Sequence, residues 1–123
     1  AHAVLDIVEE EGLCQRSMVI GERIRSFFAD LSKTHACIGD VRGLGAMTAV
    51  EFFKGGDKAR PASDIANELK AEALKRGLLL LNCGVNANVL RIMVPLTISD
   101  QILDEGLAII GGILSDLAAA GKA

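Results

Sequence analysis

Residues 37–53, CIGDVRGLGAMTAVEFF, decide how this sequence is expected to fold. A short strand is predicted at 37–42, and a second strand, rich in strand-forming residues, at 46–53. The glycines between them, Gly43 and Gly45, favour a tight reversal or a bulge. The segment therefore predicts two adjacent strands that form a hairpin, and the other elements are expected to be built around it.

Helices and further strands are predicted on both sides of this hairpin in the sequence. Apolar residues recur at spacings of three and four in three stretches, of which the first is interrupted at Gly12. The expected elements are helices at 1–34, 61–76 and 99–117 and strands at 78–81 and 89–94. This order predicts an α+β fold with a largely antiparallel sheet and helices at its sides.

Size and charge limit the classes of protein to which the chain can belong. Its 123 residues suffice for one domain and are too few for two ordinary ones, and half of them are hydrophobic. The net charge of −3 comes without a basic stripe, which argues against a nucleic-acid surface. No apolar run reaches the length of a membrane span, and the first ten residues lack the basic start of a secretory signal. We therefore expect neither nucleic acid nor membrane as a partner.

Cysteine and histidine usage argues against a metal site or a disulfide framework. Cys14, Cys37 and Cys83 are odd in number, far apart and never in a C-x-x-C pair, and His2 and His35 are the only histidines. This pattern is typical of a reducing compartment, so we expect a cytoplasmic protein and no metal ligand.

The glycine run beginning at Arg42 superficially suggests a phosphate cradle. A dinucleotide fingerprint needs a third glycine, where this chain has Thr48, and it needs a helix where a strand is predicted here. The G-K-S/T of a P-loop is also missing, and no lysine lies in an apolar pattern suited to a covalent link with a carbonyl. We therefore interpret the run as a turn between strands.

Arg91 is the most informative single residue. Alternation along 89–94 puts it on one strand face with Val89 and Met93. An arginine in an apolar strand is costly unless an anion pairs with it. One interpretation is structural, with Arg91 at a sheet edge or paired with Glu51 or another acid. The other is functional, with its guanidinium binding a carboxylate bidentately. Cys83, in a loop predicted near it, is the cysteine most worth testing.

Three segments, in their order and spacing, resemble the end of a known enzyme family. They are 41–47 (VRGLGAM, leading to Glu51), 75–81 (KRGLLLL) and 88–98 (NVLRIMVPLTI). Together they resemble the class III pyridoxal-phosphate-dependent aminotransferases, whose helix at the domain junction is similar to residues 4–11. Cys83-Gly84 ahead of the third segment looks most like the 4-aminobutyrate subfamily.

The resemblance implies a function for the intact protein. Residues 1–123 would be the small C-terminal domain of the fold-type I architecture, and Arg91 would bind a substrate carboxylate, notably that of 2-oxoglutarate or glutamate. The lysine that binds pyridoxal 5'-phosphate would lie outside this chain, which would contain no catalytic and no cofactor-binding residue. The expected partners are amino-acid and keto-acid substrates, the large domain of the same protein, and further copies of it.

Two rival interpretations do not involve an aminotransferase. A stand-alone α+β module could bind an amino acid through Arg91 and regulate another protein. An interaction domain could use Arg91 only structurally, in which case replacing it would not change the affinity for any substrate.

Overall fold

The computed structural model describes residues 2–122, which form four helices, a short 3₁₀ turn and four strands. In chain order these are α1 (His2–Glu10), α2 (Leu13–Ser32), β1 (Ile38–Leu44), β2 (Met47–Phe52), η1 (Lys54–Gly56), α3 (Ser63–Lys75), β3 (Leu81–Cys83), β4 (Val89–Ile92) and α4 (Asp100–Ala119). The predicted α+β class is confirmed. So is the interruption at Gly12, which takes a positive φ of 60° and separates α1 from α2.

The four strands form one antiparallel sheet in the order β1-β2-β4-β3. The predicted hairpin is confirmed: β1 pairs with β2 from Ile38 opposite Phe52 to Leu44 opposite Met47, with a register shift between Ile38 and Asp40. The last strand in the sequence, β4, lies between β2 and β3, so it is an inner strand.

The strand bounds differ from the prediction by one or two residues in β1 and β2, and the differences in β3 and β4 have a clear structural reason. β3 covers 81–83 and not 78–81, because the amide of Leu78 donates to the carbonyl of Ala73 (2.8 Å) and completes the end of α3. β4 ends at Ile92 and not at residue 94, because its partner β2 has Thr48 opposite Ile92 and β3 first pairs at Leu81. The apolar runs thus predicted that these strands exist, whereas pairing with neighbouring strands determined where they end.

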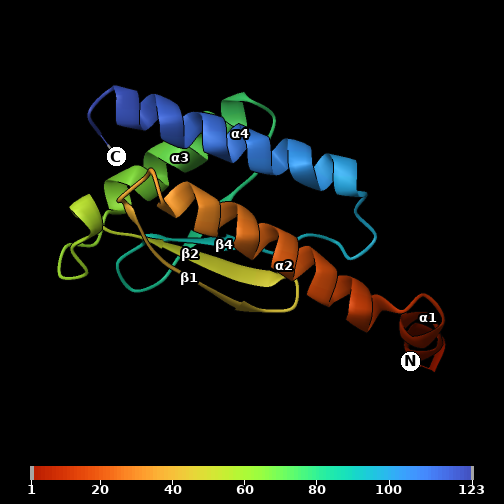
Figure 1. Ribbon diagram of the computed structural model, residues 1–123. Coiled ribbons are helices and arrows are strands. Elements are labelled where there is room, and N and C mark those ends of the chain that lie inside the picture. Colours follow the sequence, from red (N-terminus) through yellow and green to blue (C-terminus); the bar gives the residue numbers. More distant parts are fainter. Residues whose placement is uncertain (1, 123) are drawn as a thin grey trace.

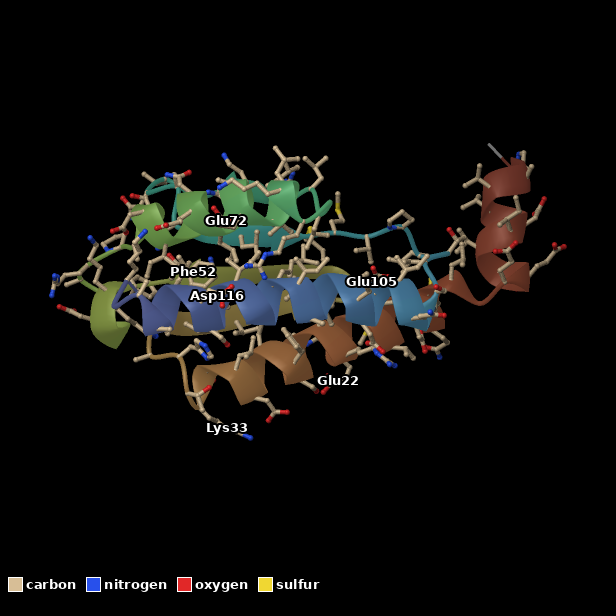
Figure 2. The ribbon with its side chains drawn as sticks, turned by 90° about the horizontal axis from the view of Figure 1, so that it is seen from above. Glu22, Lys33, Phe52, Glu72, Glu105 and Asp116 are labelled. Atoms are coloured by element: carbon tan, nitrogen blue, oxygen red, sulfur yellow. The ribbon has the colours of Figure 1, made fainter. Side chains whose placement is uncertain are left out.

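Helices α2, α3 and α4 lie on one face of the sheet, as Figure 1 shows. Alternate strand residues, including Val50 and Leu90, are fully buried beneath them, and Phe28 of α2 and Leu69 of α3 complete the same aliphatic core. Figure 2 shows α4 between α3 and α2, with charged side chains such as Glu105 on the outside. No helix within residues 2–122 lies on the opposite face of the sheet.

Ion pairs join the first and last of these three helices. Arg23 of α2 contacts Asp104 of α4 (2.5 Å), and Arg16 contacts Asp100 (2.7 Å). Arg16 also donates to the carbonyl oxygen of Ile98 (2.6 Å), which anchors the loop before α4. These contacts position α4 across the sheet.

The turn between β1 and β2 is bound to α2. Gly45 has a positive φ of 52°, which glycine adopts without steric cost, and its carbonyl accepts a hydrogen bond from Arg25 (3.2 Å). The amide of Ala46 donates to Ser17 Oγ (2.9 Å). A Cβ added to Gly21 would lie 1.8 Å from the Gly45 oxygen, so a glycine is required where helix and turn meet.

Candidate functional site

Arg91 lies on the uncovered face of the sheet, near its middle. It is opposite Ala49 of β2 on one side and Leu81 of β3 on the other. The predicted alternation is confirmed, since Arg91 and Met93 are exposed whereas Leu90 and Ile92 are buried. Val89 belongs to the exposed face by register but is itself buried, because the loop at Gly84 packs against it.

Neither structural interpretation of Arg91 matches its surroundings. Its strand is an inner one, so Arg91 is not at a sheet edge. Glu51, the suggested ion-pair partner, accepts instead from Arg42 Nη1 (Oε2, 2.8 Å). Within residues 2–122 the Arg91 guanidinium makes no hydrogen bond or ion pair. A cation that is always charged and has five N–H donors is therefore available for an anion.

A cluster of charged and polar groups lies beside Arg91 on the same face. Arg42 Nη1 contacts both Asp40 and Glu51, and these carboxylates, Asp40 foremost, raise the pKa of Arg42 above its usual value. Asn88, buried at the end of β2, donates from Nδ2 to the carbonyl of Phe52 (2.9 Å) and to Glu51 Oε1 (3.4 Å). Glu51 is thus held from two sides.

Apolar side chains surround these charged groups. Large hydrophobic residues from all four strands or their immediate ends are exposed here. They are Leu44, Met47, Leu79, Leu81 and Met93. Cys83, opposite Val89, is on the same face and half-buried. A charged fork on an apolar platform is an arrangement that suits a small carboxylate with an aliphatic chain.

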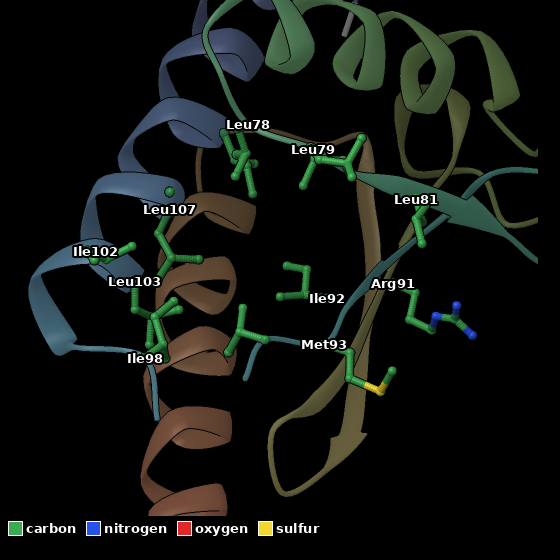
Figure 3. Close-up of a pocket in the computed structure, with 14 residues that line it drawn as sticks. Leu78, Leu79, Leu81, Arg91, Ile92, Met93, Ile98, Ile102, Leu103 and Leu107 are labelled. Atoms are coloured by element: carbon green, nitrogen blue, oxygen red, sulfur yellow. The ribbon is translucent and has the colours of Figure 1, made fainter. Parts of the chain in front are cut away.

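A separate cavity of about 310 Å³ lies on the other side of β4, between the sheet and α4. Figure 3 shows Ile92 directed toward the α4 side, whereas the guanidinium of Arg91 points the opposite way. The cavity is lined by leucines, isoleucines and other apolar residues from 78–81, 92–94 and 98–110, and by Arg91 at its rim. Because the guanidinium of Arg91 points away from Ile92, we take the open face around Arg91 as the candidate site.

Two features of residues 2–122, the lysines and the glycine run, bear on whether a phosphate group could be bound here. All six lysines (33, 54, 58, 70, 75 and 122) are exposed, and four of them are paired with carboxylates. Of the glycine run, Gly45 is in the β1–β2 turn as predicted, whereas Gly43 belongs to β1. A Cβ at Gly43 would lie 2.2 Å from the carbonyl oxygen of Met47, so the space beside it is filled by the hairpin itself.

Residues 2–122 contain neither a cluster of metal-binding side chains nor a membrane-spanning helix. No group of three or more His, Cys, Asp or Glu side chains in this range is placed to hold a metal ion. Among the helices of this range, none combines the length and the apolar character needed to cross a membrane.

Sequence reasoning named Glu51 only as a partner for Arg91 and missed its pairing with Arg42 and Asn88. A signal existed for part of the cluster: Asp40 and Arg42 are two apart in a strand, so they share a face. Asn88 stands in a predicted loop, where an asparagine has no distinctive pattern. Its contacts with Phe52 and Glu51 depend on the tertiary structure, which places Asn88 at the end of β2.

Comparisons with known proteins agree on one family. The family model described as Aminotransferase class-III matches residues 1–114. The 5-aminovalerate aminotransferase DavT of Pseudomonas aeruginosa is 44% identical over 118 residues, which are 96% of this chain and 28% of that protein. The 4-aminobutyrate aminotransferase GabT of Escherichia coli is 45% identical over 107 residues, 87% of this chain and 25% of that protein. The chain thus spans about a quarter of the length of these relatives.

The fold also matches part of a larger solved structure. A phospholyase from Arthrobacter, in complex with phosphoethanolamine, superposes with a TM-score of 0.85 at 25% identity. The match covers 94% of this chain and 27% of that one. The helices and the sheet described above therefore recur together as one portion of a longer protein.

Proposed function

Because this chain belongs to the class III aminotransferases, we propose that residues 1–123 are the small C-terminal domain of a pyridoxal-phosphate-dependent transaminase. The proposed donor is 4-aminobutyrate or a related ω-amino acid such as 5-aminovalerate, and the proposed acceptor is 2-oxoglutarate. The names and identities of the two relatives support this choice of donors. The large domain, further copies of the protein and a cytoplasmic location are part of the same proposal.

The proposal assigns Arg91 the binding of a substrate carboxylate. The observation that carries it is the unpaired guanidinium on an inner strand, in the middle of the uncovered sheet face. Its planar fork matches the two oxygens of a carboxylate, and the flanking apolar residues reduce competition from water. The neighbouring strands pair with its backbone on both sides, at Ala49 and Leu81, so the point from which the side chain extends is fixed.

Arg91 contributes orientation in this proposal, and the bound cofactor contributes the electron sink for amino transfer. The lysine and the phosphate contacts for that cofactor are assigned to the remainder of the protein. By binding one of the two carboxylates of 2-oxoglutarate, Arg91 directs the rest of the molecule away from the sheet. Positioning of this kind accelerates a reaction without any chemistry at the arginine itself.

The test is an absorbance titration of the full-length protein with 4-aminobutyrate and then with 2-oxoglutarate. We expect the cofactor band to shift with the amine and to return with the keto acid. Arg91→Ala should weaken the apparent affinity for 2-oxoglutarate about ten- to a hundredfold, as expected when a charged hydrogen-bonded pair is lost. Arg60→Ala, which removes an exposed arginine in the loop after β2, is the matched control and should leave the titration unchanged.

The possible outcomes separate the enzyme from its rivals. Without a cofactor band that responds to the amine, the transaminase proposal fails, and a non-catalytic amino-acid-binding module becomes the better interpretation. With such a band but with Arg91→Ala equal to the wild type, the enzyme stands and the role of Arg91 is wrong. Repeating the first step with 5-aminovalerate then ranks the two candidate donors.

A further inference from the structure

The face that contains Arg91 also contains a carboxylate that can compete with the substrate. Glu51 is two residues from Ala49, the residue directly opposite Arg91, and both side chains point to the same side of the sheet. Diagonal neighbours on an antiparallel sheet have Cβ atoms about 7–8 Å apart, within reach of long side chains. A free Glu51 would therefore pair with Arg91 and occupy the fork that the substrate needs.

Arg42 is the rival cation for this carboxylate. Ala49 is paired with Arg42 on one side and with Arg91 on the other, so the two arginines flank the same small residue. Neighbouring strands are about 4.8 Å apart, which places the two backbones about 10 Å from each other. Glu51 is diagonal to both arginines, and its position between them does not by itself decide which one it contacts.

The remaining contacts decide in favour of Arg42. Glu51 Oε2 accepts from Arg42 Nη1 (2.8 Å), and Asn88 Nδ2 approaches the other oxygen, Oε1 (3.4 Å). Asn88 is almost fully buried (1% exposed) and anchored to the Phe52 carbonyl, so it holds the carboxylate at the end of β2 that is farther from Met93. Asp40, the second carboxylate on this face, is paired with the same Arg42 nitrogen. Both acids are thereby kept from Arg91.

We infer that Arg42 is a positioning residue for substrate binding: by holding Glu51 and Asp40, it keeps Arg91 free for the substrate carboxylate. The inference rests on the proposed function of Arg91, and it assigns to Arg42 no contact with the substrate. Asn88 contributes to the same arrangement through its contact with Glu51 Oε1. Removal of Arg42 leaves Glu51 without its cation, and Glu51, diagonal to Arg91 on the same face, would then pair with Arg91.

The experiment uses the full-length protein with its cofactor and follows two readouts. One is the dissociation constant of glutarate, an unreactive dicarboxylate, measured by isothermal titration calorimetry; the other is KM for 2-oxoglutarate together with kcat. In Arg42→Gln we expect both constants to rise roughly fivefold, the size expected when a surface ion pair competes, with kcat little changed. Arg42→Lys should retain most of the affinity, because a lysine still pairs with Glu51.

The decisive variant is the double substitution Arg42→Gln with Glu51→Gln, which removes the competing carboxylate as well. It should restore the glutarate affinity to within about twofold of the wild type, since only Asp40, farther from Arg91, remains unpaired. Arg76→Gln, which breaks an exposed ion pair with Asp116 on the helical side, should change neither constant.

Three results would overturn the inference. If Arg42→Gln binds glutarate as well as the wild type, or if the double variant is as weak as Arg42→Gln, then Arg42 does not act by restraining Glu51. Both results leave the proposed function standing, provided that Arg91→Ala binds glutarate poorly. If Arg91→Ala binds as well as the wild type, the proposed function fails and the role of Arg42 fails with it.

Discussion

At the scale of single residues, the three cysteines differ in how deeply their thiols are buried. Cys14 is exposed and Cys83 half-buried, whereas Cys37 is buried (1% exposed), between the end of α2 and β1. Burial disfavours the thiolate and raises the pKa of the Cys37 thiol. Cys37 is thus a core residue and not a nucleophile, whereas Cys83 remains accessible on the face of Arg91.

The shift of Cys37 leads to a prediction about alkaline stability. Because its pKa is higher in the folded than in the unfolded protein, its contribution to stability is complete below the unfolded value of about 8.5 and is lost as the pH rises toward the folded value. In urea unfolding of the full-length protein between pH 8 and 11, Cys37→Ala should therefore lose stability less steeply with pH than the wild type.

Cys14→Ala provides the control for this measurement, because it removes an exposed thiol and leaves Cys37 in place. Its stability should fall with pH in parallel with the wild type. Parallel curves for Cys37→Ala as well would mean that the Cys37 thiol is not protected in the folded protein.

At the scale of elements, close contacts matter more than helical propensity. Gly21 and Gly106 are both inside helices, where alanine is ordinarily preferred by about 1 kcal/mol. An added Cβ would lie 1.8 Å from the backbone oxygen of Gly45 at the first position, but 3.7 Å from a leucine methyl group at the second. Only the first contact holds the β1–β2 turn against α2.

We therefore expect opposite effects from the same substitution at these two glycines. Gly21→Ala should lower the free energy of unfolding by about 1–3 kcal/mol, because a backbone oxygen cannot swing aside. Gly106→Ala should leave it unchanged or raise it by up to about 1 kcal/mol. Chemical denaturation of both variants in the full-length protein checks this. Equal stabilities would show that the helix and the turn separate more easily than their contacts indicate.

At the scale of the whole molecule, the two faces of the sheet differ in what covers them. One face is buried under α2, α3 and α4 (Figure 1). The other carries exposed Leu81 and Met93 around Arg91. Large exposed apolar patches favour association. The isolated chain lacks about three quarters of the length of its relatives and exposes this face to water.

Residues 1–123, produced alone, should therefore self-associate through the open face. Sedimentation velocity at rising concentration should show species larger than the monomer. Met93→Lys should reduce their fraction, whereas Val19→Lys, which replaces an exposed residue of α2 on the helical side, should not. A chain that stays monomeric at high concentration would contradict this prediction.

Sequence alone determined the class of the fold and most of its elements. Helical periodicity, the glycines at 43–45 and strand alternation are local patterns, and local hydrogen bonding and sterics decide them. The same alternation assigned Arg91 and Met93 to one strand face. It failed at the ends of β3 and β4, because a strand ends where its partner ends, and the partner is remote in sequence.

Only the tertiary structure decided the order of the strands and the pairing of the charges. Placing β4 between β2 and β3 made Arg91 an inner residue and set it across from Ala49. The same register put Glu51 between two arginines, and a buried Asn88 completed its contact with Arg42. The contacts of Glu51 join residues that are 9 and 37 positions apart along the chain, and a local sequence pattern does not show which of these residues meet.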